Sequence, residues 1–575
     1  MRRAERPGAA GALLACAIAL GVALGFWLSD YYLFLATSAV TAAIIARSIG
    51  LVTGEAGMIT LCQMGFAAVG AYVTTGLTTS TGLPFLAQVA LATLAGIPFG
   101  LAVGLPALRI RGINLAVITL GFAVALDIFV SRQNFPGVEA GVGVLPPAPL
   151  DTVRGYYLFC LACFVAVCAA LAVLSRGRAG AAWLAVRHSE RAAATLGLSV
   201  TRTKLQAFAL SAMVASMGGA LMAGQVQLPT PDAFNPLTSL VAFAAAVMFA
   251  ARYPEGAVLA GGVGVALQEA FRRLSIPLDY VDLLFGVGVV DVLRRGRGGV
   301  AQQLRSALAA RRRRTQVEDR AHAVGAPPAT TAAAVARGSA PPALRTDGLT
   351  VRYGAVVAVE SLDLVVPAGA VVALIGPNGA GKSSAIDAIA GFVAYEGTVH
   401  VAGETIDHRS VHGRARAGLR RAFQQDRTIP DLTVGRYLEL AARGPVTKGE
   451  LAEVLAFVGG VAPSNLIAEL DVGTRRLVEV AGVLVARPVV AMLDEPAAGL
   501  APAESRQLAQ RVTEVPERFG AAVLLVEHDM EHVQAAASTA VVMDFGRVIA
   551  RGPTAAVLRN EAVIAAYLGN EVPAA

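Results

Sequence analysis

The residues with the clearest chemical purpose lie in the second half of the chain, in a run that reads LIGPNGAGKSS. Gly376, Gly381, Lys382 and Ser383 have the spacing G-x-x-x-x-G-K-[ST], and the apolar sequence VVALI leads into them. A loop between a strand and a helix points backbone N–H groups at phosphate oxygens, because a helix N-terminus favours anions. The sequence therefore predicts a nucleotide site in which Lys382 reaches the β- and γ-phosphates and Ser383 binds Mg²⁺. The other predicted cradle residues are Asn378, Gly379, Ala380 and Ser384.

Two further apolar runs end in residues that suit phosphoryl transfer to water. VVAMLDEP places Asp494 and Glu495 at a strand end, and AAVLLVEHDM does the same for His528. Asp494 would bind Mg²⁺, Glu495 would take a proton from the attacking water, and His528 would bond a γ-phosphate oxygen. Each run alone is explained by a capped strand end, but their presence together and in this order favours nucleotide hydrolysis.

The elements that must position these residues belong to one of two unlike halves. The chain is 55% hydrophobic and 15% charged, against about 25% charged for a typical soluble domain. Long apolar runs extend to about residue 295, and an ordinary soluble domain begins at about residue 343. The net charge is +7, but the arginines cluster beside apolar runs and in one linker, as membrane topology requires, so we predict no nucleic-acid binding.

The first half contains about ten runs with the length and apolarity of membrane spans. They lie near 11–28, 33–49, 57–78, 85–106, 113–131, 156–175, 205–226, 237–251, 256–271 and 280–293. Arginines precede the first run and follow the last, which predicts cytoplasmic ends and an even number of spans. Arg272 and Arg273 break this charge pattern. Glu55 lies in a glycine-rich stretch, 50–72, that fits either a broken helix lining a path or close helix packing.

Two segments between the halves are informative. The inner loop at 185–204 predicts a short amphipathic helix followed by a turn at Gly197, which either enters a groove on a cytoplasmic partner or lies at lipid headgroups. The basic, Ala- and Pro-rich stretch 296–342 has no apolar period and predicts a linker. The expected domains are thus 1–295 in the membrane, the linker, and 343–575 around the nucleotide.

The order of these motifs, with Tyr353 before them and Gln424 between them, resembles an ABC-transporter ATPase. The resemblance implies that Tyr353 stacks on adenine and that Gln424 senses Mg²⁺ and couples to a membrane domain. LDEPAAGL, VEHDM and YLGNE are similar to the ATPase subunits of branched-chain amino acid importers. Together with the apolar runs of the first half, this resemblance predicts the fold class. We expect an N-terminal all-α polytopic membrane domain with about ten helices plus a C-terminal α/β P-loop ABC ATPase.

The first half is similar to the permease of the same importers. GLVTGEAG, GAYV, LRIRGINLAVITLGF and LGLSVTRTKLQAFALSA carry this resemblance over about 30–295. It implies that the 185–204 loop holds a coupling helix that docks near Gln424.

The signature loop, which acts on the partner ATPase in such dimers, departs from the family pattern. LDVGT places Asp471, Gly473 and Thr474 where Leu-Ser-Gly-Gly-Gln is usual, and Ala501 replaces an acid or amide in the next loop. A carboxylate at ~4 Å from γ-phosphate would be repelled by ~4 kcal/mol at an effective dielectric near ~20. Alternatively, Asp471 caps the following helix. We therefore expect one competent and one weakened site in a pair with a different ATPase.

These observations predict a fused permease–ATPase subunit of an importer that couples ATP hydrolysis to uptake of a small solute, chiefly branched-chain or other hydrophobic amino acids. Amides or urea are an alternative cargo. Two other readings are an ABC exporter half that acts as a homodimer and a membrane-anchored ATPase that carries no solute. The expected partners are a second permease, a second ATPase and an extracytoplasmic solute-binding protein, with the chain in the plasma membrane and its ATPase in the cytoplasm.

Overall fold

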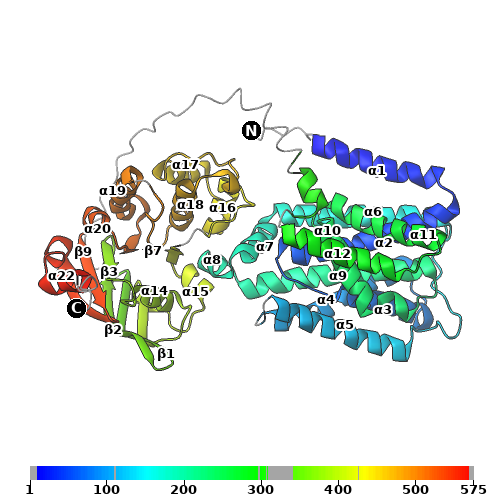
Figure 1. The fold of residues 1–575 in the computed structure, drawn as a ribbon, viewed down its shortest axis with the longest axis horizontal. Coiled ribbons are helices and arrows are strands. Elements are labelled where there is room, and N and C mark those ends of the chain that lie inside the picture. The colour runs from blue at the N-terminus through cyan, green and yellow to red at the C-terminus, as the bar shows by residue number, and fades with distance from the viewer. Residues whose placement is uncertain are drawn as a thin grey trace. The chain divides into compact units, whose positions relative to one another are not determined.

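The computed structural model describes residues 9–108, 110, 112–295, 298–305, 307, 341–424, 427–500 and 502–568. They form two compact units, one helical and one α/β, and the α/β unit includes Leu184–Val200 from the inner loop (Figure 1). Most of the predicted linker and Ala501 lie outside the described residues.

The helical unit places one helix in each apolar run of the first half. These helices are α1 (Ala9–Trp27), α2 (Asp30–Ile49), α3 (Gln63–Ser80), α4 (Phe85–Ala107), α5 (Ile113–Gln133), α6 (Val153–Arg176), α9 (Val200–Val226), α10 (Pro236–Met248), α11 (Pro254–Arg273) and α12 (Asp279–Arg295). Short elements join them: the 3₁₀ helix η2 (Pro231–Phe234) and α7 (Arg178–His188). Among the described residues, five helices are long and apolar enough to cross a membrane, and they begin at Asp30, Phe85, Asn114, Val153 and Val200.

The chain between α2 and α3 is not a regular span. A π-helical turn, η1 (Gly50–Glu55), extends α2, and α3 begins only at Gln63, so the prediction of one run over 57–78 is wrong at its start. Glu55 is 8% exposed. It accepts a hydrogen bond from Arg47 Nη2 at 2.9 Å and one from Ser175 Oγ at 2.5 Å. The helix is thus broken, and Glu55 lies at a helix interface, as the packing alternative predicts.

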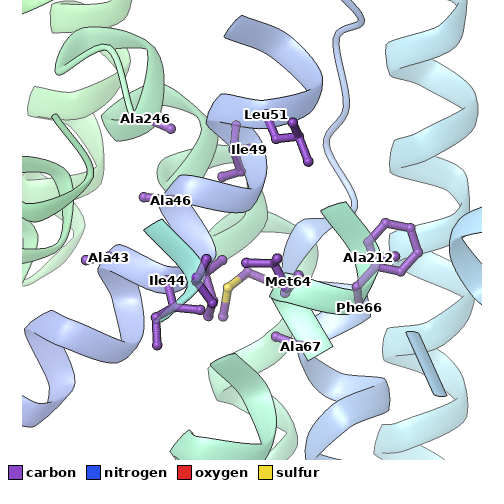
Figure 2. Packing of buried hydrophobic residues seen from close by; sticks show 14 of the residues in the cluster. Ala43, Ile44, Ala46, Ile49, Leu51, Met64, Phe66, Ala67, Ala212 and Ala246 are labelled. Carbon is purple, nitrogen blue, oxygen red and sulfur yellow. The ribbon is translucent and has the colours of Figure 1, made fainter. Parts of the chain in front are cut away.

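Small residues bring α3 and α9 into close contact. A Cβ on Gly219 would lie 1.8 Å from the backbone oxygen of Ala67, and one on Gly70 would lie 1.9 Å from that of Ser216. Such reciprocal approach without side chains is the usual packing of membrane helices. The surrounding core combines many alanines with larger apolar side chains, and Ala67 and Phe66 are examples of the two kinds (Figure 2).

Arg272 and Arg273, the two arginines that break the predicted charge pattern, share one carboxylate. Arg272 and Arg273 both donate to the carboxylate of Glu269, one turn earlier on α11. The hydroxyl of Tyr31 also donates to Glu269, at 2.6 Å. One carboxylate balances only one of the two positive charges, so the arginines remain an exception to the predicted charge pattern.

The α/β unit contains two sheets. The antiparallel sheet has the order β2-β1-β4-β5, formed by β1 (Leu344–Tyr353), β2 (Val356–Val366), β4 (Glu396–Val401) and β5 (Glu404–Thr405). The second sheet has the order β10-β9-β3-β8-β7-β6, formed by β3 (Val371–Ile375), β6 (Leu419–Ala422), β7 (Val490–Asp494), β8 (Ala522–Val526), β9 (Thr539–Asp544) and β10 (Arg547–Pro553). Every residue of β3, β7 and β8 is buried, which explains their continuous apolar sequence.

Helices surround these sheets (Figure 1). They are α8 (Glu190–Thr195), α14 (Lys382–Ala390), α15 (Val411–Arg416), α16 (Val434–Ala442), α17 (Lys448–Phe457), α18 (Val472–Leu484), α19 (Pro502–Phe519), α20 (Met530–Ala536), α21 (Thr554–Val557) and α22 (Glu561–Leu568), with a 3₁₀ turn at Ile467–Glu469.

Candidate functional site

The topology brings the predicted site residues to one edge of the six-stranded sheet. Strands β3, β8, β7 and β6 are parallel neighbours in that order. The phosphate loop follows β3, His528 follows β8, Asp494 ends β7 and Gln424 follows β6. Ligands of α/β sheets bind at the carboxyl ends of such strands. One sheet edge therefore collects four chain segments that are far apart in the sequence.

The phosphate loop is shaped by glycine where α14 begins. Gly381 has a φ of +98° and precedes the first residue of the helix, and a Cβ there would lie 2.3 Å from the Ala358 oxygen. Asn378, Gly379 and Ser383 are exposed, and the other predicted cradle residues are half-buried or buried: Gly376, Ala380, Gly381, Lys382 and Ser384. The loop therefore presents backbone and hydroxyl groups at the helix N-terminus, the arrangement that binds phosphate.

Lys382 folds back onto this loop. Its Nζ donates to the backbone oxygens of Gly376 at 2.6 Å and Pro377 at 2.9 Å. Burial lowers the pKa of Lys382, and the carboxylates of Glu495 and Asp494 oppose that shift. These two hydrogen bonds hold the Lys382 ammonium within the phosphate loop, where the sequence predicts it. A bound phosphate would compete with the two carbonyls for this ammonium.

Glu495 lies between Gln424 and His528. Its Oε2 accepts a hydrogen bond from Gln424 Nε2 at 2.8 Å, and its Oε1 lies 3.7 Å from His528 Nδ1. Glu495 has a φ of +46°, which is unusual for a residue with a side chain, and its N–H donates to the Val526 oxygen of β8 at 2.8 Å. The neighbouring strand thus holds the carboxylate beside the two side chains that the sequence predicts around the γ-phosphate.

Asp494 is buried and held by an arginine that the sequence prediction did not include. Its Oδ2 accepts from Arg421 Nη2 at 2.9 Å. Burial raises the pKa of Asp494, and the Arg421 guanidinium opposes this effect. Arg421 also donates to Asp387 of α14. Arg421 is the second residue of the RRAFQQ run, three residues before Gln424, but nothing in that run indicates its two acidic partners.

A second missed residue is Glu527, directly before His528. It is 2% exposed, and its Oε1 accepts a hydrogen bond from the Ala497 N–H at 3.3 Å. Burial raises the pKa of Glu527 to about 7. A buried acid with a shifted pKa beside Glu495 is typical of functional sites, and the sequence offered only the pair Glu-His at a strand end.

Tyr353 and the signature loop belong to different elements from the phosphate loop. Tyr353 ends β1, and its ring is 49% exposed. Asp471 caps α18, since its Oδ1 accepts from the Thr474 N–H at 2.8 Å and its Oδ2 accepts from Thr474 Oγ1 at 2.6 Å. These bonds lower the pKa of Asp471. The capping alternative therefore describes this carboxylate, with Gly473 buried in the first turn.

The inner-loop segment docks on the α/β unit through arginines that bind its backbone. Arg420 Nη1 donates to the Thr195 oxygen at 3.0 Å, and Arg416 Nε donates to the Gly197 oxygen at 3.2 Å. Both carbonyls lie at or after the end of α8. Burial lowers the pKa of Arg420 to about 10. The segment is also buried from Ala192 to Leu196, so it packs into the α/β unit, as one of its two predicted interpretations requires, and we call the surface that holds it the groove.

Side-chain contacts add to this docking. His188 Nε2 lies 3.1 Å from Asp431 Oδ2, and Arg191 Nη1 lies 3.4 Å from Asp387 Oδ2. Arg427 Nη1 donates to Ser189 Oγ at 3.2 Å. The groove therefore combines backbone recognition with opposite charges.

Known families match both halves. The model described as "Branched-chain amino acid transport system / permease component" matches residues 31–293, the ABC transporter model matches 359–498, and the model for the branched-chain amino acid ATP-binding cassette transporter matches 547–573. The solved ADP conformation of an ATP-binding cassette of an ABC transporter is 26% identical, with a TM-score of 0.37, and aligns over 40% of this chain and 99% of that one.

Curated relatives match the second half. The high-affinity branched-chain amino acid transport ATP-binding protein BraF of Pseudomonas aeruginosa is 32% identical over 40% of this chain and 98% of its own length. LivG of Escherichia coli K12, with the same description, is 31% identical over the same shares. The zinc import ATP-binding protein ZnuC of Alkalilimnicola ehrlichii is 36% identical over 39% of this chain and 84% of its own. The chain belongs to the branched-chain amino acid ABC transporter family and joins its permease component to its ATP-hydrolysing component in one polypeptide.

Proposed function

We propose that this chain uses ATP hydrolysis to import a small solute, most directly a branched-chain or other hydrophobic amino acid. The observation that carries the proposal is the docked inner loop, since a segment flanked by permease helices lies in one compact unit with the nucleotide site. The family model and the BraF and LivG relatives support the cargo, which their descriptions name.

The chemistry assigned to the site follows from its donors. Ser383, Gln424 and Asp494 offer oxygen atoms, which Mg²⁺ prefers over nitrogen or sulfur. When bound, Mg²⁺ neutralises charge on the phosphate oxygens. Lys382 then holds the β- and γ-phosphates, Glu495 accepts a proton from the attacking water, and Tyr353 stacks on adenine.

His528 and Gln424 contribute by position. Both lie on Glu495, Gln424 through a hydrogen bond at 2.8 Å and His528 at 3.7 Å from the carboxylate. His528 would bond the γ-phosphate, while Gln424 would register its presence through Mg²⁺. A change at the nucleotide then reaches Glu495 and, through Gln424, strand β6, which carries the docking residue Arg420.

The assembly that we propose has two permeases and two ATPases, in the plasma membrane, with about ten spans per permease and the ATPase in the cytoplasm. An extracytoplasmic solute-binding protein would deliver the cargo. Asp471 and Thr474 in the signature loop favour a different partner ATPase, because the carboxylate, although it caps α18, would bring a negative charge toward a γ-phosphate across such a dimer.

Vesicles that contain the full assembly provide the test. With ATP inside, they should accumulate labelled leucine, and Lys382→Ala should abolish accumulation. Lys448→Ala, which removes an exposed lysine from α17, is the matched control and should leave uptake unchanged. Competition by unlabelled isoleucine, but not by acetamide or urea, would support the amino acid. Equal uptake with Ala at position 382 would refute the proposal.

A further inference from the structure

We propose that Arg191 of the docked inner loop is a positioning residue for the Mg²⁺-binding carboxylate of Asp494. A chain of alternating charges links the two: Arg191, Asp387, Arg421 and Asp494. The inference rests on the proposed function, since it concerns how docking of the inner loop at Arg191 changes Mg²⁺ binding at Asp494.

The outer link joins the inner loop to α14. Arg191 Nη1 lies 3.4 Å from Asp387 Oδ2, and its guanidinium also lies over the Phe392 ring, 5.0 Å from the centroid. The aromatic contact fixes the arginine at the acid even though its side chain is 49% exposed. Docking of the loop therefore brings a positive charge to Asp387.

The inner links are buried. Arg421 donates through Nη1 to Asp387 Oδ1 and through Nη2 to Asp494 Oδ2. The side chains of Arg421 and Asp494 are 5% and 7% exposed, and that of Asp387 is 18% exposed. Water and salt screen these buried ion pairs much less than they screen exposed ones. One guanidinium is thus shared by two carboxylates, only one of which belongs to the nucleotide site.

The sharing gives the chain a direction. When Arg191 neutralises Asp387, the ion pair between Arg421 and Asp387 weakens and the ion pair between Arg421 and Asp494 strengthens. Asp494 must then break a stronger ion pair before it can bind a cation. When the loop leaves, Asp387 draws Arg421 away, and the Asp494 carboxylate becomes available. Docking of the loop therefore weakens the hold on Mg²⁺, and its release strengthens that hold.

Binding measurements on the full chain in nanodiscs test this, with Glu495→Gln throughout so that no hydrolysis occurs. The readout is the ratio of the ATP dissociation constant in EDTA to that in Mg²⁺. Arg191→Gln should raise this ratio by about two- to fivefold, the range of a partly exposed ion pair. Asp387→Asn should lower it, because Arg421 then serves Asp494 alone. Arg191→Lys should restore most of the wild-type ratio.

The double variant and a matched control sharpen the result. In the Asp387→Asn background, Arg191→Gln should have no further effect, since the link between the two is already broken. Arg487→Gln removes an arginine whose side chain is also 49% exposed but which pairs with Glu453 rather than with Asp387, so it should leave the ratio unchanged.

Shifts of the same sign for Arg191→Gln and Asp387→Asn, or no shift for Arg191→Gln, would overturn the inference. If Asp387→Asn does not fold, the Arg191 variants decide alone. ATP binding that persists in Lys382→Ala would instead overturn the proposed function, so the two failures are distinguishable.

Discussion

Glu495 combines a strained backbone with a position between two polar partners, and this is where a general base is expected. Glu495→Gln should reduce ATP hydrolysis by about 100-fold or more, because the amide cannot accept the proton. ATP binding should persist, since Lys382 and the phosphate loop are untouched. Phosphate release and equilibrium ATP binding measure the two effects. Glu517→Gln, on the exposed face of α19, is the control, and a comparable loss in that variant would contradict the assignment.

Glu527 makes stability depend on pH. Its pKa is about 7 in the folded chain and about 4.3 in an unfolded one. A raised folded pKa means that this stabilising contribution is present below about pH 4.3 and is lost as the pH rises to about 7. Glu527→Gln should therefore be more stable than wild type at pH 8 and lose this advantage toward pH 5, by on the order of 3 kcal/mol in total. Thermal unfolding across that range would show it, and parallel curves would exclude it.

Asp471 has a local role that can be separated from its charge. Asp471→Ala should lower the free energy of unfolding by about 1 kcal/mol through loss of the N-cap, whereas Asp471→Ser should keep the cap. If the carboxylate weakens a site shared by two copies, Asp471→Ser should also raise the ATP hydrolysis of the purified chain. An unchanged rate in that variant would remove the charge argument for a different partner ATPase.

At the scale of elements, the contact of α3 with α9 depends on two glycines. Gly219→Val should destabilise the helical unit, because a Cβ there meets the Ala67 backbone at 1.8 Å, which a rigid helix cannot relieve. Gly264→Ala on α11 is the control, since its Cβ has no heavy atom within 4 Å. Thermal aggregation of the detergent-solubilised chain measures both. Equal melting temperatures would show that α3 and α9 separate at little free-energy cost.

The same scale shows why some elements could be predicted and others not. The buried parallel strands before Glu495 and His528 could be predicted from the sequence because their apolar runs stop at polar residues. The break between α2 and α3 could be predicted only in part: the glycines indicated it, but the contact of Glu55 with Ser175 of α6 could not be predicted. Side-chain pairing across distant helices leaves no periodic trace in a sequence.

The site was predictable to a similar degree. Lys382, Glu495 and His528 have fixed spacing from strand ends, so their meeting at one sheet edge follows from parallel topology. Arg421 could not be assigned, because its two partners, Asp387 and Asp494, come from other elements. Sequence reasoning predicted residues for ligand contact, but it did not predict the side chains that hold those residues in place.

At the scale of the whole molecule, the fusion should matter most when the protein is dilute. The composition of 296–342 predicts a linker, and a flexible linker would give an effective concentration in about the millimolar range. A protease site inserted between residues 315 and 335 should leave uptake intact at micromolar protein, while the cleaved halves separate at nanomolar protein because α8 spans only six residues. Size-exclusion chromatography at both concentrations tests this. Halves that stay together at nanomolar concentration would show that the groove alone suffices.

The groove around α8 contacts both the main chain and the side chains of the inner loop. Arg420 binds the carbonyl oxygen of Thr195, which any residue at that position would supply, whereas His188 and Arg191 lie against acidic side chains. A permease from another gene would therefore fit the same ATPase if it kept these two residues, whatever residue stood at position 195. A permease could then change the solute that it carries during evolution without a matching change in the ATPase, and one ATPase could serve several permeases.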